Sequence, residues 1–465
     1  MVSLRGTTGA YRGVMSTVAP FFAGWMARQR WYATKGRTPV LRVIGSMEET
    51  LDEGLVMTLL VIDEAPDKPV LYQVPVVART SPLPGGDAAF IGSSDGVYLY
   101  DGPHDPAYAH ALLATMASEK HVEGSDVTAD GHRVSDPGRV TRSRVLEGEQ
   151  SNTSIIYDIE GESHPVIAKV FRVLHHGENP DVTSQAALTR GSSTRVPESF
   201  GYLTASWPDP GRDDGAAFGH LAFAQEFLPG SEDAWRVALQ AARTSTDFTT
   251  AAYELGVATA EVHRTLASEL GTVEAGPAEI EGALASMRRR ITTASREVPE
   301  VGEHADAIRA VYDVVATLDW PGLQRIHGDL HLGQALQSPE RGWVLLDFEG
   351  EPLRPMPERS RPDVTLRDVA GMLRSFDYVA GSLAQERPRI DASAWASASR
   401  HAFVDGYNAG AETDVRAQRA LLDAFEIDKA VYEAIYESRN RPGWLGIPLG
   451  AIARLVARSA GVARP

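Results

Sequence analysis

Hydrophobic and polar residues alternate along much of the first hundred residues of the chain. Leu55–Ile62 and Val70–Val77 have the period-two pattern of half-buried strands, and Glu64–Lys68 supplies a turn between them. The partly apolar stretch Val18–Arg30, which precedes these strands, is predicted to form a helix. The pattern therefore indicates a strand-rich block at residues 1–106.

A second strand-rich block is predicted for residues 107–230. It begins with a helix at Ala107–Ser118. The stretch Gly124–Gly138, rich in Gly, Pro, Ser and Asp, is interpreted as a linker at a subdomain boundary. Four strands are expected after this stretch, at Val140–Leu146, Ile155–Asp158, Val166–Phe171 and Ala222–Leu228.

Helical spacing dominates the remaining region, 231–465. The apolar positions of Ala252–His263 recur three and four residues apart, as on one face of a helix. Two short strands, one beginning at Leu323 and one at Trp343–Leu346, are expected to form a hairpin-like pair. Helices are expected at 235–318, at Leu366–Ala380 and onward to about Ser438. The predicted fold class is therefore α+β.

Composition and charge narrow the classes of protein that fit this pattern. With 465 residues, 43% of them hydrophobic and 23% charged, the chain is expected to fold into two or three packed units. Its net charge of −17 argues against extended binding to nucleic acid or to an anionic membrane, since both need clustered positive charge. The absence of cysteine excludes disulfides, zinc thiolate sites and thiol nucleophiles.

Hydropathy gives an expectation for localisation. No stretch reaches the roughly 18 consecutive apolar residues of a membrane-spanning helix. Val14–Met26 is a short apolar stretch, but Trp25, Gln29 and Arg30 stand where a signal peptide would need small residues before its cleavage site. We therefore expect a soluble cytoplasmic protein, a monomer or homodimer, that binds small molecules and neither nucleic acid nor membrane.

The clearest chemical pattern lies in two segments near residue 340. Ile326–Gln334 contains Asp329 and Gln334, and Asp347 opens a second acidic segment thirteen residues after Gln334. Phosphoryl transfer from a nucleotide to a hydroxyl needs a carboxylate that orients or deprotonates the hydroxyl, and oxygen ligands for Mg²⁺. Asp329 fits the first role, and Gln334 and Asp347 fit the second. Alone, either segment could be a turn or a helix cap; together they predict a phosphoryl-transfer centre.

A strand lysine would complete the nucleotide side of this centre. Lys169 lies among apolar neighbours, so on an inward face it would need an anion such as the phosphates of ATP; on an edge strand it would simply be exposed. The polar segment Glu147–Ser154, whose only glycine is Gly148, is expected to cover the phosphates. The predicted nucleotide-binding residues are Lys169, Ser151, Asn152 and Thr153, with the backbone at Gln225 and Phe227 for the adenine.

The phosphoryl acceptor is expected to bind along Lys429–Asn440. Tyr432 and Tyr436 are four residues apart, as are Glu433 and Glu437, so each pair shares a helix face. Aromatic planes suit the apolar face of a sugar ring, and carboxylates suit its hydroxyl groups. In the alternative, the tyrosines pack in the core and the charges are solvated. The predicted substrate-binding residues are His331, Glu349, Tyr432, Glu433, Tyr436, Arg439 and Trp444.

Several other polar and aromatic residues allow two interpretations. The segment Gln29–Gly36 could line a sugar or phosphate site, or its Trp31 and Tyr32 could pack beneath a sheet. Glu349 and Glu351, beside Asp347, could touch metal or sugar, or could only support their neighbours. His263 is expected to be a packed or capping histidine near the end of its helix.

The two catalytic segments carry a family resemblance. His327–Gln334, with Asp347-Phe-Glu-Gly-Glu-Pro352, resembles the catalytic and metal-binding segments of aminoglycoside-phosphotransferase-like kinases. More narrowly, the chain resembles the actinobacterial maltokinases, through Leu366–Tyr378, Glu426–Glu433 and Arg439–Trp444. The resemblance spans most of the chain and is strongest between Arg325 and Leu449.

This resemblance implies a bilobal protein-kinase-like fold. Its parts would be an N-terminal cap subdomain at 1–106, an intermediate nucleotide-binding subdomain at 107–230, and a helical C-lobe with the catalytic and sugar-binding site at 231–465. The implied reaction is the ATP- and Mg²⁺-dependent phosphorylation of maltose at its anomeric hydroxyl, which gives α-maltose 1-phosphate for glycogen and α-glucan synthesis. Arg367 and Asp368 would support the catalytic loop, as such residues do in many kinase C-lobes.

One segment departs from the maltokinase pattern. Maltokinases tend to show Asn-Pro-Asp, a hydrophobic residue and then a glutamate, whereas Asn179–Val182 is followed here by Thr183. The partner of the strand lysine is therefore open, with Glu178, Asp181 and Gln185 as candidates.

Three functions are alternatives to the predicted maltokinase activity. A related sugar or amino-sugar kinase, such as a glucosamine kinase, would use the acidic C-terminal segment to hold an ammonium group. A sugar-binding pseudokinase is disfavoured because Asp329, Gln334, Asp347 and Lys169 are intact. An aminoglycoside resistance kinase is disfavoured by the N-terminal block and by the tail that carries Tyr and Trp.

Overall fold

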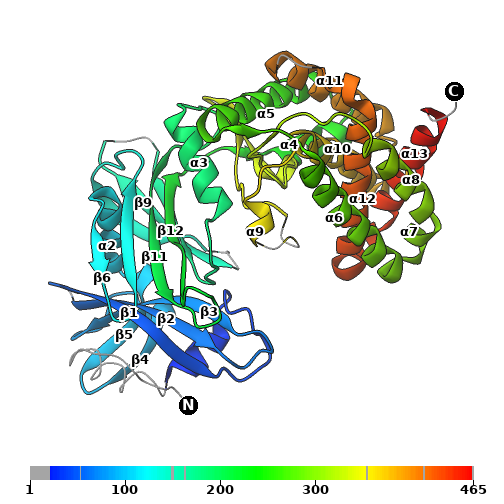
Figure 1. The fold of residues 1–465 in the computed structure, drawn as a ribbon. Helices are drawn as coiled ribbons and strands as arrows, with labels where there is room; N and C mark the ends of the chain where they lie inside the picture. The colour runs from blue at the N-terminus through cyan, green and yellow to red at the C-terminus, as the bar shows by residue number, and fades with distance from the viewer. Residues whose placement is uncertain are drawn as a thin grey trace. The chain divides into compact units, whose positions relative to one another are not determined.

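The computed structural model describes residues 21–52, 54–147, 151–161, 164–351, 354, 356–411 and 414–462 (Figure 1). Contacts divide the chain into two compact units. The first comprises Met1–Ala186 and Pro197–Pro229, and the second comprises Ala187–Val196 and Gly230–Pro465. Each unit has its own hydrophobic core.

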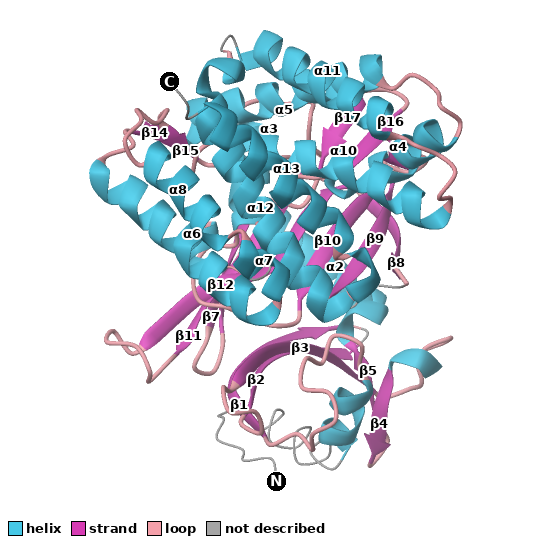
Figure 2. Ribbon diagram, turned by 90° about the vertical axis from the view of Figure 1, so that its right-hand side faces the viewer, coloured by secondary structure: helices cyan, strands magenta, loops and turns pink. Residues whose placement is uncertain are grey.

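The first unit begins with a five-stranded antiparallel sheet in the order β1-β2-β3-β5-β4, whose first strands curve strongly (Figure 2). Its strands are β1 (Leu41–Leu51), β2 (Gly54–Asp63), β3 (Val70–Arg79), β4 (Phe90–Ser94) and β5 (Val97–Asp101). The two strands predicted in this region are confirmed as β2 and β3. Residues 21–28 are helical, and Trp25 and Met26 from this helix are buried in the core of the sheet.

Trp31 and Tyr32 pack in this core, which decides between the two interpretations of their segment. Their exposed fractions are 6% and 1%. The Tyr32 hydroxyl donates to Asp63 Oδ2 at 2.5 Å, and the guanidinium of Arg172 lies 4.7 Å from the centre of the Trp31 ring. Both aromatic residues therefore belong to the interior and not to a binding surface.

A seven-stranded antiparallel sheet follows in the order β6-β7-β11-β12-β10-β9-β8. Its strands are β6 (His121–Glu123), β7 (Thr128–Arg133), β8 (Val140–Val145), β9 (Asn152–Ile159), β10 (Val166–Phe171), β11 (Ser199–Pro208) and β12 (Ala216–Glu226). The four strands predicted here are confirmed as β8, β9, β10 and β12, while β11 was not predicted.

The prediction of a linker at Gly124–Gly138 is wrong, because β7 lies inside this stretch. The buried positions of β7 are the small residues Ala129 and Gly131. A Cβ on Gly131 would lie 2.0 Å from the carbonyl oxygen of Thr115 in helix α2 (Pro106–Ala117). The close approach of α2 thus requires a small residue at position 131. Because glycine is not hydrophobic, β7 lacks the hydrophobic pattern by which a strand is recognised in a sequence.

Buried polar side chains join the two sheets of the first unit. The Gln73 amide, on β3, donates to the carbonyl oxygens of Phe171 at 3.1 Å and Leu221 at 2.9 Å. Arg172 is fully buried and donates to both carboxylate oxygens of Asp101, at 2.8 and 2.7 Å. These bonds give buried partners to the Gln73 amide and to the Nη2 group of Arg172.

The second unit is mainly helical. Its helices are α4 (Ala234–Arg243), α5 (Thr249–Leu270), α6 (Pro277–Glu297), α7 (Pro299–Glu303), α8 (Ala305–Val315), α9 (Met356–Arg359), α10 (Leu366–Glu386), α11 (Ser393–Ala411), α12 (Arg419–Asn440) and α13 (Gly446–Val462). The helical prediction is confirmed, and α13 extends it. Helices α10 and α12 contribute buried residues on most sides and form the centre of the unit. Among the described helices, none combines the length and hydropathy needed to cross a bilayer.

The hairpin predicted from the strands at Leu323 and Trp343–Leu346 is not formed. Strand β15 (Leu323–Gln324) pairs with β14 (Thr272–Val273), whereas β17 (Gly342–Leu345) pairs with β16 (Ala335–Ser338). The segment after β15 cannot continue a ladder, because a side chain of α10 takes up its backbone N–H groups.

The buried pair of Arg172 and Asp101 provides a stability test. Asp101→Ala leaves the guanidinium buried and without its carboxylate, so we expect the free energy of unfolding to fall by about 3–5 kcal/mol. The control is Glu160→Gln, which breaks the exposed pair with Arg139 and is expected to cost less than about 1 kcal/mol. Urea unfolding followed by tryptophan fluorescence measures both. Equal losses would contradict a structural role for the buried pair.

Candidate active site

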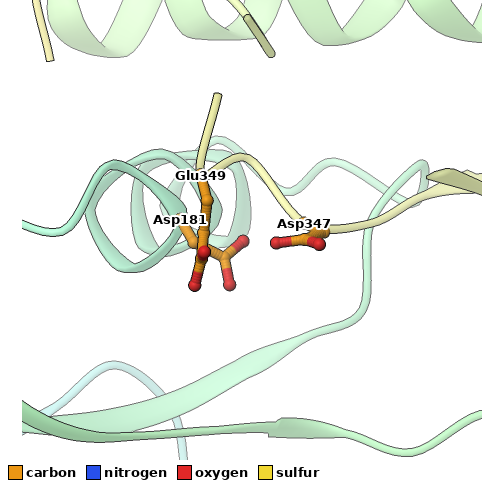
Figure 3. Close-up of side chains that lie close together, drawn as sticks. All are labelled: Asp181, Asp347 and Glu349. Atoms are coloured by element: carbon orange, nitrogen blue, oxygen red, sulfur yellow. The ribbon is translucent and has the colours of Figure 1, made fainter. Parts of the chain in front are cut away.

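The loop that follows β17 carries two of the predicted acidic residues. Asp347 has a φ of 62°, in the left-handed region, which aspartate tolerates better than most residues. Asp347 and Glu349 (Figure 3) each offer a carboxylate oxygen, and these atoms lie within 4.8 Å of one another. Gln334 Nε2 donates to Asp347 Oδ2 at 3.3 Å, so the side chain that bears the amide oxygen lies beside Asp347. Three side chains that bear hard oxygen atoms thus meet at one place, as binding of Mg²⁺ requires.

A buried carboxylate on α10 fixes the segment that carries Asp329. Asp368 accepts the backbone N–H groups of His327 at 2.7 Å and Gly328 at 2.9 Å. It also bonds to His263 Nε2 at 2.9 Å. Burial alone would raise the pKa of Asp368, but its bonds to His263 and to the loop lower that pKa below the usual range. The expected supporting role of Asp368 and the packed position of His263 are both confirmed.

His327 joins the two catalytic segments. Its Nε2 donates to the carbonyl oxygen of Leu346 at 2.8 Å, and its Nδ1 accepts the N–H of Asp329 at 3.3 Å. The segments also approach closely at two glycines with positive φ, since a Cβ on Gly328 would lie 3.2 Å from the Cα of Gly350. The positions of Asp329 and Asp347 are therefore set by one ring and two glycines.

Asp329 is paired with a lysine from α12. Lys429 Nζ donates to Asp329 Oδ1 at 2.7 Å and to Glu351 Oε1 at 3.0 Å. Its ammonium lies 4.7 Å from the centre of the Tyr432 ring. Burial favours the neutral amine, yet the carboxylates of Asp329 and Glu351 raise the pKa of Lys429 above its usual value. Glu351 is itself buried and bonds to Lys429. Of its two interpretations, contact with a ligand or support of its neighbours, the structure favours support.

A cavity of about 560 Å³ opens beside Asp329 in the second unit. It is lined by helices α4, α10 and α12, by the 3-10 turn Pro442–Trp444 and by the catalytic loop. The structure brings seven predicted residues to its wall: Asp329, His331, Gln334, Tyr432, Glu433, Tyr436 and Trp444. Tyr436 is 40% exposed, and the Trp444 ring stacks on Tyr378 with a centroid distance of 6.3 Å.

The two glutamates of this wall are held by arginines. Glu433 Oε2 accepts from Arg374 Nε at 3.0 Å and from Nη2 at 2.8 Å. Glu437 accepts from Arg441 at 2.6 and 2.9 Å, and from the Tyr378 hydroxyl at 3.2 Å. Burial raises the pKa of Glu433 despite its arginine. Their carboxylates are therefore fixed in direction before any acceptor binds.

His331 is a neutral group on the cavity wall. Its burial lowers its pKa to about 4, so the ring is uncharged at pH 7. Its Nδ1 accepts the N–H of Gly333 at 3.0 Å.

Two predicted substrate-binding residues are not brought to this cavity. The Arg439 guanidinium pairs with Glu297 of α6 at 2.6 and 2.7 Å, away from the lining residues. Glu349 stays with Asp347 on the loop after β17 and does not line the cavity. Arg439 lies in the last turn of α12, where the helix turns it toward α6, while Arg441 beyond the helix end reaches the cavity instead.

Other lining residues were not among the predicted site residues. Lys429, Tyr378, Arg441 and Asp233 contribute side chains to the wall. A lysine on an otherwise buried helix face was a usable indication for Lys429, because such a cation needs a carboxylate partner. For Tyr378 and Asp233, the sequence contains no comparable indication.

Lys169, the strand lysine of the first unit, is paired with Asp181, one of its three candidate partners. Lys169 Nζ lies 3.1 Å from Asp181 Oδ2, in the first turn of α3 (Pro180–Arg190). Gln185 Nε2 donates to the other oxygen of Asp181 at 2.5 Å. Thr183, which replaces the expected glutamate, bonds to the carbonyl oxygen of Asn179. Lys169 is therefore paired with a carboxylate even though Thr183 replaces the glutamate of the family pattern.

The sheet register separates Thr153 from Lys169. Lys169 is opposite Ser154, so these two side chains share a face and Thr153 points to the other one. The Thr153 hydroxyl accepts from buried Arg172 at 2.8 Å. Its predicted place among the phosphate-binding side chains is therefore wrong. Ser151 and Asn152 precede it at the start of β9, and Gly148 lies outside the described residues.

The segment predicted to hold the adenine lies at the end of β12. Gln225 is on this strand, opposite Ile167 and Ser199. Phe227 follows it, and its N–H already donates to the carbonyl oxygen of Pro165 at 2.7 Å. This bond leaves the Phe227 N–H occupied within the first unit.

Comparison with known proteins agrees with this arrangement. The maltokinase N-terminal cap domain family matches residues 25–105. A glucosamine kinase of Streptacidiphilus jiangxiensis is 30% identical over 331 residues, which cover 66% of this chain and 72% of that protein. A glucosamine kinase of Mycolicibacterium smegmatis is 28% identical over 395 residues, which cover 79% of this chain and 92% of that protein.

Solved structures share the fold. A glucosamine kinase solved in complex with glucosamine, ADP and inorganic phosphate is 22% identical and aligns with a TM-score of 0.68, covering 93% of this chain and 99% of that one. A second crystal form of glucosamine kinase gives a TM-score of 0.69 at 23% identity, covering 94% and 99%. With its kinase-like fold, its cap domain and these relatives, the chain belongs to the maltokinase-like sugar kinases of the aminoglycoside-phosphotransferase and protein-kinase-like family.

Proposed function

We propose that this chain transfers the terminal phosphoryl group of ATP to a hydroxyl group of an amino sugar, with glucosamine as the first candidate. The observation that carries the proposal is the position of Asp329 on a cavity whose wall combines carboxylates with aromatic rings, of which that of Tyr436 is exposed. Carboxylates suit an ammonium group and sugar hydroxyls, and the rings suit the apolar face of a pyranose. The curated relatives described above, which are glucosamine kinases, support the same acceptor.

In this proposal Asp329 orients the acceptor hydroxyl and receives its proton as the phosphoryl group is transferred. Lys429 donates a hydrogen bond to this carboxylate at 2.7 Å, and its ammonium stays charged at neutral pH because the neighbouring carboxylates raise its pKa. The ammonium also places a positive charge where negative charge collects around the reacting oxygens. Asp368 and His327 keep Asp329 in position through the backbone.

Gln334 and Asp347, with Glu349 beside them, would hold Mg²⁺ through their side-chain oxygens. The ion would neutralise charge on the phosphates of ATP. Lys169 would bind phosphate oxygens, with Asp181 directing its ammonium. Ser151 and Asn152 would cover the phosphates, and the backbone near Gln225 would meet the adenine.

On the acceptor side, Glu433 and Glu437 would receive the ammonium and hydroxyl groups of the sugar. Arg374 and Arg441 hold these carboxylates in place. Tyr436 and Trp444 would contact the ring face. His331, neutral at pH 7, would contribute a hydrogen bond without adding a positive charge that repels an ammonium.

Maltose is the second candidate acceptor, with α-maltose 1-phosphate as the product. The match to the maltokinase cap domain favours it, as does a cavity of about 560 Å³, which has room for a disaccharide. The product would then serve glycogen and α-glucan synthesis. Glucosamine stands first because the two curated relatives described above are glucosamine kinases and because an ammonium group suits a wall rich in carboxylates.

A turnover assay with Mg²⁺ and ATP, run in parallel with glucosamine, maltose, glucose and an aminoglycoside, tests the proposal. We expect the highest kcat/KM with glucosamine, and phosphorus NMR of the product locates the phosphate. Turnover restricted to maltose, with an anomeric phosphate, would replace the acceptor and keep the site. If none of these compounds supports ATP turnover, the proposal is contradicted.

The role of Asp329 predicts the effect of Asp329→Asn. The amide keeps the shape but cannot accept the proton, so kcat should fall about 10²–10⁴-fold while the Kd for ATP stays within a few-fold. The control is Asp306→Asn, which changes a fully exposed aspartate of α8. Nucleotide binding is measured by calorimetry. A kcat near that of the unsubstituted protein would remove Asp329 from the reaction.

The aromatic wall predicts a selective effect on the acceptor. Tyr436→Ala removes a ring contact worth about 1 kcal/mol, so the KM of the acceptor should rise about fivefold and that of ATP should not change. Tyr253→Ala is a matched control, because Tyr253 has nearly the same exposure, 41% against 40%, and does not line the cavity. Equal KM values for the two variants would place Tyr436 outside the acceptor site.

A further inference from the structure

The second unit contains another cavity, of about 730 Å³, that shares no lining residue with the acceptor cavity. It lies among α10, α11, α13 and the beginning of α12. Six arginines line it: Arg374, Arg400, Arg416, Arg419, Arg454 and Arg458. Six cations on the wall of one cavity are unusual in a protein with a net charge of −17.

The carboxylates that balance these arginines lie mostly behind them. The acidic lining residues are Asp377 and Asp391. Asp423, Glu426 and Glu433 bond to the arginines but do not line the cavity, and each is buried. The lining of the cavity therefore carries six guanidinium groups against two carboxylates, and buried carboxylates fix the directions of Arg374, Arg400, Arg419 and Arg458.

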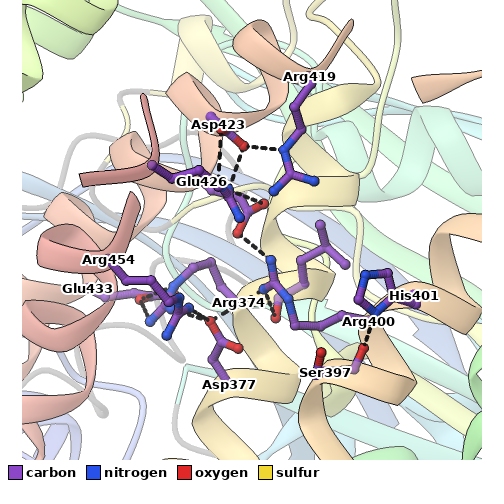
Figure 4. A network of polar contacts seen from close by, with 12 residues as sticks. Arg374, Asp377, Ser397, Arg400, His401, Arg419, Asp423, Glu426, Glu433 and Arg454 are labelled. Carbon is purple, nitrogen blue, oxygen red and sulfur yellow. Dashed lines mark hydrogen bonds and ion pairs between the residues drawn. The ribbon is translucent and has the colours of Figure 1, made fainter. Parts of the chain in front are cut away.

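Three of the guanidinium groups converge on a single carboxylate. Figure 4 shows Arg374, Arg400 and Arg454 around Asp377, whose Oδ2 accepts from them at 2.8, 3.3 and 2.5 Å. Arg400 also donates to Glu426 at 2.8 Å. Arg374 and Arg400 also have buried carboxylate partners, whereas the Arg454 side chain is 54% exposed beside Asp377. Planar guanidinium forks held in this way have the geometry that binds phosphate through two N–H groups.

The rest of the wall suits a sugar. Ser393 and Ser397 offer hydroxyl groups at the start of α11, and Asp391 offers a carboxylate. Leu422 and Ile447 give apolar surface for a ring face. A ligand with a phosphate at one end and hydroxyl groups on a small ring would satisfy all three kinds of group.

We infer that this arginine-lined cavity is a second ligand site, which binds a phosphorylated sugar and acts on the acceptor cavity through Arg374. The same guanidinium donates to Asp377 in the arginine-lined cavity and to Glu433 on the wall of the acceptor cavity. A phosphate that competes with Asp377 for Arg374 changes the hold on Glu433, and thereby the affinity for the acceptor. The binding stands on this geometry alone, whereas the effect on the acceptor rests on the proposed function.

Calorimetry with glucose 6-phosphate as the probe tests the binding. We expect binding to the unsubstituted protein, about tenfold weaker binding to Arg454→Gln, and unchanged binding to Arg309→Gln, which alters an exposed single-pair arginine of α8. Glucose, which lacks the phosphate, should not bind at this site. Tyr436→Ala, in the acceptor cavity, should leave the affinity unchanged. Loss of binding in Tyr436→Ala but not in Arg454→Gln would overturn the proposal, because the probe would then occupy the acceptor cavity only.

Turnover measurements test the coupling. Glucose 6-phosphate should change the KM of the acceptor in the unsubstituted protein and have little effect in Arg454→Gln, whose turnover without the probe should stay within about twofold of normal. An equal change of KM in both proteins would mean competition at the acceptor cavity and would overturn the coupling. If no sugar supports turnover, the proposed function fails, while the calorimetric result still decides whether the site exists.

Discussion

The buried carboxylate of Asp368 is the interaction on which the rest of the candidate active site depends. It accepts two backbone N–H groups of the catalytic loop and a ring N–H of His263, so an irregular segment without strand partners is held by one ionised side chain of α10. Such a carboxylate is costly to bury unless its oxygens are fully occupied, and here three donors occupy them. Because α10 also lines the acceptor cavity and the arginine-lined cavity, this one helix orients the loop, the acceptor wall and the arginine-lined wall.

Buried charge is arranged around that helix in pairs whose members come from distant parts of the chain. Arg374 of α10 meets Glu433 of α12, and Lys429 of α12 meets Asp329 of the catalytic loop. Removing one member of such a pair leaves an uncompensated charge, so each member constrains the position of its partner. The result is a set of functional groups whose directions are fixed by their partners before a ligand arrives.

The predictions that failed share a physical cause. The strand β7 was hidden because the close approach of α2 requires Gly131, and glycine carries no hydrophobic pattern. Thr153 was predicted to bind phosphate because it lies in the polar segment Glu147–Ser154, but on β9 its side chain lies on the face opposite to that of Ser154 and Lys169. Arg439 was grouped with Tyr436 on the acceptor side, although the helix turns it toward α6. In each case the error arose from packing or register, which spacing along the chain does not specify.

The sequence by itself determined the strands β2, β3 and β10, the helical second unit, and the short-range pattern that places Asp329, Gln334 and Asp347 together. These features depend on periodicity and on residues within about twenty positions of one another. Tertiary structure alone decided that Lys429 pairs with Asp329, one hundred residues away, and that Asp181 pairs with Lys169. It also decided which side chains line each cavity. A buried charge selects its partner by where the folded backbone brings an opposite charge within about 3 Å, and that distance exists only after the helices have packed.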